Sequence, residues 1–99
     1  MKIKYISENG KIEAVFSEES DWNLFNRIAD FIAEKFNGHW FEKVDGLDQR
    51  YWDIGIENTV LTLHLEHYLG ISLFPAREND AEANNLMRKI GDYLEANFL

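Results

Sequence analysis

The chain is predicted to fold as an α+β two-layer sandwich, in which a mostly antiparallel sheet carries two helices packed on one face. Two long segments repeat their apolar residues at the three- and four-residue spacing of amphipathic helices, and the other segments alternate apolar with polar residues as half-buried strands do. The strand-like segments in the second half are joined by only two to four residues, too few for parallel crossovers. The expected order is ββαββββα, in a single domain over residues 1–99.

A β-hairpin is predicted at the start of this order. Residues 2–7 and 11–16 alternate polar with apolar side chains. Between them, Asn9-Gly10 supplies the positive φ angles that a tight hairpin turn requires.

The first helix is expected from about Asp21 to Asn37. Ser20 is the predicted N-cap with Asp21 in the first turn, and Asn37-Gly38 is a typical C-terminal stop. The apolar face consists of Trp22, Phe25, Ile28, Ala29, Ile32 and Phe36.

A strand over residues 39–44 and a loop should follow, and then an antiparallel meander of three strands over residues 50–57, 60–66 and 70–74. Pro75 should end the last strand, because proline has no N–H for the ladder. Period-two alternation turns Leu61, Leu63 and Leu65 toward the helices. The opposite face then carries Tyr51, Asp53, Glu57, Thr62, His64 and Glu66.

The helical period returns from Asn79 onward, with Asp80 and Glu82 near the positive end of the helix. Gly91 lies inside this segment and costs about 1 kcal/mol relative to alanine. A close backbone contact at Gly91 would explain its presence.

Composition excludes several classes of function. Eighteen acidic against ten basic residues give a net charge of −8, which disfavours nucleic-acid binding because phosphate recognition needs clustered lysine and arginine. The absence of cysteine excludes disulfides and thiolate chemistry, and together with the lack of a secretory signal or an 18-residue apolar run it favours a cytoplasmic protein away from membranes.

The sequence His64-Leu65-Glu66-His67 contains residue types that bind zinc, but its spacing does not match a zinc motif. On a strand, His64 and Glu66 share a face while His67 points away. With Asp53 nearby, His64 is a candidate general base. No nucleophile elbow or nucleotide-binding motif is present, so we predict no catalytic residues, no metal site and no cofactor.

Aromatic residues form the other candidate site. One ring of Trp40 and Phe41 should enter the core, while the other, with Tyr51 and Trp52, is expected to form an exposed patch of the kind that anchors protein interfaces. Carboxylates nearby in sequence would attract a basic partner. The predicted partner-binding residues are Trp40, Tyr51, Trp52, Asp53, Glu57, His64 and Glu66.

The strand sequences Trp52-Asp53-Ile54, Leu61–His67 and Ile71–Phe74 resemble those of small uncharacterised bacterial domain families and, less closely, of immunity proteins of bacterial toxin systems. The resemblance covers roughly a third of the chain and includes no catalytic motif, so it implies no functional residues.

The leading hypothesis is a small acidic, non-enzymatic protein-binding domain, such as an immunity protein or an inhibitor of a basic partner. One alternative is a small enzyme or metal-binding domain centred on His64 and Glu66. Another is a homodimer formed through an uncovered sheet face or an edge strand.

Overall fold

The structure, a computed structural model, describes residues 2–8, 10–77 and 81–98. It confirms the α+β fold and the order ββαββββα. The helices are α1 (Trp22–Lys35) and α2 (Ala81–Asn97). The strands are β1 (Lys4–Glu8), β2 (Lys11–Ser17), β3 (His39–Asp45), β4 (Gln49–Ile56), β5 (Thr59–Glu66) and β6 (Gly70–Pro75).

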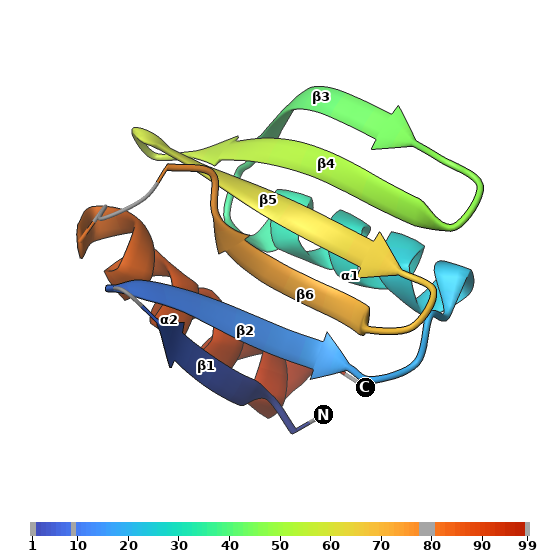
Figure 1. Ribbon diagram of the computed structural model, residues 1–99. Helices are drawn as coiled ribbons and strands as arrows, with labels where there is room; N and C mark the ends of the chain where they lie inside the picture. The colour runs from blue at the N-terminus through green and yellow to red at the C-terminus, as the bar shows by residue number, and fades with distance from the viewer. Residues whose placement is uncertain (1, 9, 78–80, 99) are drawn as a thin grey trace.

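The strands form one antiparallel sheet in the spatial order β1-β2-β6-β5-β4-β3 (Figure 1). From β3 to β6 each strand pairs with the next along the chain, as the short connections predict. The N-terminal hairpin joins the sheet differently, because β2 pairs with β6 and Val15 lies opposite Ser72. The pairing register shifts in β2 between Val15 and Ser17, and in β3 between Trp40 and Glu42.

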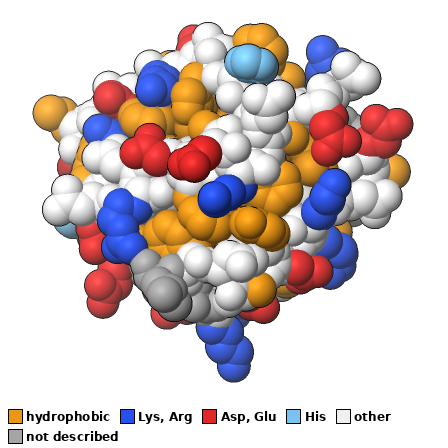
Figure 2. Space-filling view, turned by 180° about the vertical axis from the view of Figure 1, so that it is seen from behind, with side chains coloured by type: hydrophobic (Ala, Val, Ile, Leu, Met, Phe, Trp, Pro, Cys, Tyr) orange, Lys and Arg blue, Asp and Glu red, His pale blue; other side chains and the backbone are white. Residues whose placement is uncertain are grey.

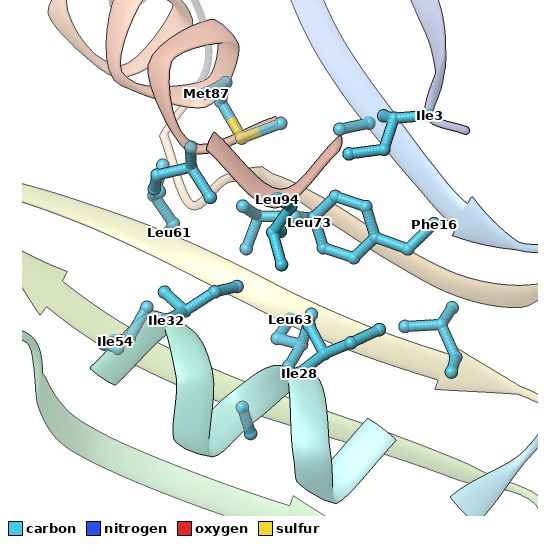
Figure 3. Close-up of a cluster of buried hydrophobic side chains, with 14 of the residues drawn as sticks. Ile3, Phe16, Ile28, Ile32, Ile54, Leu61, Leu63, Leu73, Met87 and Leu94 are labelled. Atoms are coloured by element: carbon cyan, nitrogen blue, oxygen red, sulfur yellow. The ribbon is translucent and has the colours of Figure 1, made fainter. Parts of the chain in front are cut away.

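Both helices lie on one face of the sheet, and the core fills the space between the layers (Figures 1 and 3). Leu61, Leu63 and Leu65 are fully buried there, as their alternation predicts. Figure 3 shows Ile32 of α1 and Met87 of α2 among the side chains of this cluster. The fully buried apolar side chains of the described strands therefore face the helix-bearing side.

The start of α1 differs by one residue from the prediction. The N-cap is Asp21 rather than Ser20: its backbone is extended, and its side chain accepts a hydrogen bond from the N–H of Leu24 at 3.0 Å. A carboxylate at this position also interacts favourably with the helix dipole.

The end of α1 is a Schellman motif. Asn37 has a φ of 53°, and the N–H of Gly38 donates to the carbonyl oxygen of Ala33 at 2.9 Å. This bond satisfies a carbonyl that has no partner within the helix. The predicted stop at Asn37-Gly38 is therefore confirmed, with the asparagine rather than the glycine in the left-handed conformation.

The described part of α2 begins at Ala81, so the predicted start at Asn79 and Asp80 lies outside the described residues. Gly91 contacts the ring of Tyr5 from β1, and a Cβ at residue 91 would lie 2.9 Å from its Cζ. The predicted close contact at Gly91 is thus present, between a strand side chain and the helix backbone.

The other predicted boundaries differ from the structure by one or two residues where they can be compared. Pro75 is the last residue of β6. In the first hairpin, Asn9 lies outside the described residues, while Gly10 has the positive φ of 77° that the turn requires.

Candidate functional site

No helix covers the second face of the sheet in the described part of the chain (Figure 1), and we call this surface the open face. Residues paired across antiparallel strands point to the same side, so the register identifies its members. They are Lys4, Ile6, Lys11, Glu13, Val15, His39, Phe41, Glu42, Val44, Gln49, Tyr51, Asp53, Gly55, Val60, Thr62, His64, Glu66, Ser72 and Phe74.

Four of the predicted site residues lie on the open face: Tyr51, Asp53, His64 and Glu66. Of the other three, Glu57 is exposed in the turn that follows β4, where its φ is 56°. One row of paired residues crosses all six strands through Lys4, Val15, Ser72, His64, Tyr51 and Val44.

His64 occupies the centre of this row. Its ring stacks on Tyr51 with 4.3 Å between centroids and 17° between planes, and Phe74 contacts it edge to face at 5.8 Å. Only 8% of the residue is exposed. The buried Nε2 has no hydrogen-bond partner, and the Oε2 of Glu66 lies 3.9 Å from it.

Burial lowers the pKa of His64 below its ordinary value, because the charged imidazolium loses its hydration. The carboxylates of Glu66 and Glu13 act in the opposite direction, but the effect of burial is larger. His64 is therefore a neutral imidazole at pH 7, with a ring nitrogen that lacks a partner.

Asp53 is part of a separate polar pair. It accepts a hydrogen bond from the hydroxyl of Thr62 at 2.7 Å, and its partner across β3 is Glu42. Among the described residues, neither Asp53 nor Glu42 forms a hydrogen bond or an ion pair with His64. The register therefore does not bring Asp53 and His64 together as a catalytic pair.

The expected grouping of Trp40 and Trp52 with Tyr51 is wrong in its geometry. Trp40 pairs with Ile54, and both tryptophans pack against the core on the helix-bearing side. Tyr51 precedes Trp52 on one strand, so their side chains point to opposite faces. The predicted patch is thus divided between two surfaces.

Cationic side chains cover the two tryptophans on that side. The Nζ of Lys43 lies 4.3 Å from the ring centre of Trp52 and 5.5 Å from that of Trp40. The guanidinium of Arg50 lies 4.9 Å from the Trp52 ring, and its Nε is 3.2 Å from a carboxylate oxygen of Asp45. These cation–π contacts join β3 and β4 on the helix-bearing side.

The rest of the helix-bearing side is occupied by rings that join the two helices. Phe31 contacts Tyr93 and Phe98 at 5.8 and 5.3 Å, and Phe36 contacts Tyr93 at 5.6 Å. Figure 2, which views this side, shows hydrophobic side chains gathered in the middle among charged ones. The ring contacts of Phe31, Phe36, Tyr93 and Phe98 join α1 and the C-terminal segment on this side.

Three exposed apolar side chains of the open face were not among the predicted site residues: Phe41, Val44 and Ile6, which are 69, 49 and 44% exposed. The register places Ile6 opposite Glu13 and Val44 opposite Tyr51, so both lie on this side. Phe41 follows the inward-facing Trp40, so simple alternation already puts its ring on the open face, where it lies over Gly55. The bulge in β3 then adds Glu42 to the same face. Sequence periodicity does not reveal a bulge.

Two hollows lie on or beside the open face. One, of about 230 Å³, is lined by His64 and by Lys4, Ile6, Glu13, Val15, Glu18, Leu69 and Ser72. The other, of about 480 Å³, surrounds Phe41 and Gly55 near the β4–β5 turn. Each combines apolar walls with charged or polar groups, as small binding sites do.

Within the described ranges, no three His, Asp or Glu side chains come together as metal ligands would. None of the helices described is both long and apolar enough to cross a membrane.

Comparison with known proteins adds a family. A family model described as "Protein of unknown function (DUF3630)" matches residues 1–90. No curated protein and no solved structure matches the chain.

Proposed function

The chain belongs to the DUF3630 family of proteins of unknown function, and we propose that it is a non-enzymatic protein-binding domain that presents the open face to a basic protein partner. One observation carries this proposal: the open face leaves Phe41, Val44 and Tyr51 accessible, although the opposite face of the same sheet is densely covered. Exposed apolar groups gathered on one surface are typical of interaction sites.

The charge of the open face indicates the kind of partner. It carries four carboxylates, of Glu13, Glu42, Asp53 and Glu66, against two ammonium groups, of Lys4 and Lys11. Aromatic anchors with an acidic surround attract a partner of opposite charge and guide its approach. A basic protein surface is therefore the complement that this face fits.

An inhibitor or a bacterial immunity protein is the specific form of the proposal. A small acidic domain that blocks a basic enzyme needs a preformed rigid surface and no chemistry of its own. A sheet face provides such a surface, because its side chains are held by the backbone ladder. A basic toxin encoded beside this chain would identify the partner class.

Affinity capture with matched variants tests the proposal. The open-face variant combines Val44→Ser with Tyr51→Ala, which removes two paired side chains of the central row. The control combines Leu47→Ser with Tyr68→Ala, whose side chains are even more exposed but lie between strands, away from the open face. We expect a basic protein to be captured by the wild type and the control and lost with the open-face variant.

Titration with the purified partner then gives the quantitative test. The open-face variant should bind at least about tenfold more weakly, which is the loss of one anchor residue. Equal affinity of both variants would contradict the proposal. A species of twice the chain's mass, lost only in the open-face variant, would instead assign this face to a homodimer.

A second candidate function is catalysis centred on His64 and Glu66. The specific observation in its favour is a neutral imidazole 3.9 Å from a carboxylate, with the hydroxyl-bearing Ser72 opposite on β6. Hydrolysis of an activated ester is the direct assay. Activity above background that disappears with both His64→Phe and Ser72→Ala would replace binding as the leading function.

A further inference from the structure

From the hollow beside His64 we infer a binding site for a single arginine side chain, supplied by the basic partner. The inference rests on the proposed function and makes it more specific. The hollow opens on the open face between β1, β2, β6 and β5, whose residues line it together with Glu18 and Leu69.

The size of the hollow suits a long side chain. Its volume of about 230 Å³ is several times the 30 Å³ or so that one water molecule occupies in the liquid. Ile6, Val15 and Leu69 give it apolar walls, and Ile6 and Leu69 are themselves 44 and 66% exposed. Such walls pack against the methylene stem of an arginine or a lysine.

The polar groups of the hollow select a cation. Glu13 and Glu18 contribute two carboxylates, and Lys4 contributes one ammonium group, whose Nζ is 3.8 Å from Glu18. Glu13 therefore retains a negative charge that the ammonium group of Lys4 does not neutralise in this arrangement. A guanidinium pairs with such a carboxylate through parallel hydrogen bonds.

His64 supplies the independent indication of a ligand. The residue is more than nine-tenths buried, it lines the hollow, and its Nε2 lacks a hydrogen-bond partner. A buried polar atom without a partner is costly, so structures rarely retain one without a reason. In a neutral imidazole one ring nitrogen donates and the other accepts, and as the acceptor Nε2 would take its strongest hydrogen bond from a cationic donor.

Arginine fits these groups better than lysine. Its planar fork carries five N–H donors, more than one carboxylate uses, so donors remain for a second acceptor in the hollow.

Titration with a small probe tests this site without the partner. N-acetylarginine amide is added to the ¹⁵N-labelled full chain and followed by NMR, with N-acetylcitrulline amide as the neutral control of nearly equal shape. We expect saturable shifts at Glu13, His64, Leu69 and Ser72, with a dissociation constant of about 1 to 10 mM. The citrulline probe should give no saturable shifts.

Two charge-removing variants complete the test. Glu13→Gln should weaken arginine binding about fivefold, the effect of one partly exposed ion pair. Glu82→Gln, on α2, is the matched control and should leave the affinity unchanged. Equal binding of both probes, absence of saturation at about 50 mM, or equal effects of the two variants would overturn the arginine site.

The two proposals fail separately. If the arginine probe binds and no partner depends on the open face, the protein-binding function is wrong and the site remains. If a partner depends on the open face but the arginine probe does not bind, only the arginine site is wrong.

Discussion

His64 is almost fully buried, although it lies on the open face of the sheet. Tyr51 and Phe74 bury its ring, yet it lies on the face without helices. This placement keeps the imidazole neutral and leaves Nε2 unpaired. A single residue therefore makes the open face sensitive to pH.

We expect the stability of the wild type to fall as the pH drops from about 7.5 to about 5.5. The folded-state pKa of His64 lies below its ordinary value of 6.5. Below pH 6.5 the unfolded chain therefore binds more protons than the folded one, and protonation stabilises the unfolded state. The stability contributed by the neutral imidazole is complete above 6.5 and is lost as the pH falls through the folded-state pKa.

Urea unfolding at both pH values measures this effect. The control is His64→Phe, which keeps a ring to stack on Tyr51 but cannot be protonated. An identical pH dependence in wild type and variant would contradict the assignment to His64.

Gly91 provides a second prediction at this scale. Gly91→Ala carries a steric cost of about 1 to 3 kcal/mol, because the new methyl group enters the space of the Tyr5 ring and hydroxyl. The higher helix propensity of alanine offsets about 1 kcal/mol of this cost, so the net destabilisation should be up to about 2 kcal/mol. In a Tyr5→Phe background the cost should be smaller, since the nearest atom is removed. Denaturant unfolding of the wild type, the two single variants and the double variant measures this cost. An equal cost of Gly91→Ala in both backgrounds would exclude the Tyr5 hydroxyl as its cause.

The N-cap of α1 is Asp21 rather than the predicted Ser20, and the stability of variants can distinguish the two residues. Asp21→Ala removes the side chain that accepts from Leu24, and should lower the free energy of unfolding by about 1 kcal/mol. Ser20→Ala is the matched control and should change it by less than about 0.5 kcal/mol. Chemical denaturation of both variants measures these changes. A larger loss of stability for Ser20→Ala than for Asp21→Ala would identify Ser20 as the N-cap.

The strands show how much of the fold and of the candidate site the sequence can predict. Period-two alternation correctly placed the buried leucines of β5 and the polar residues opposite them, because the repeat follows directly from backbone geometry. It also separates Tyr51 from Trp52, a consequence that the predicted aromatic patch ignored. The bulge at Phe41 was unpredictable, since an extra residue in one strand leaves no periodic signal.

The contacts of Arg50 and the hollow beside His64 depend on residues far apart in the sequence, so periodicity could not predict them. Arg50 follows a loop in the sequence and looks like an ordinary surface cation. In the structure it contacts Trp22, Trp52 and Asp45, which lie on three different elements. The hollow beside His64 likewise depends on the pairing of β2 with β6, which no local pattern indicates.

The net charge of −8 leads to a prediction for the whole molecule. The association rate with a basic partner should fall at least about tenfold as the salt concentration rises from about 50 to 500 mM, because long-range attraction is screened within a few ångströms at high salt. The dissociation rate should change much less. Stopped-flow mixing measures both rates, and a salt-independent association rate would contradict electrostatic steering.

The pairing of β2 with β6 also determines when the sheet can be completed. During synthesis the β3–β6 meander closes only short loops, whereas β2 must wait for Gly70–Pro75 before its second edge is paired. Closing that long loop costs more entropy than forming any hairpin of the meander. We therefore expect docking of the N-terminal hairpin to be the late step in folding. Until it occurs, the edges of β2 and β6 are the places where a newly made chain is most exposed to misassociation with another copy.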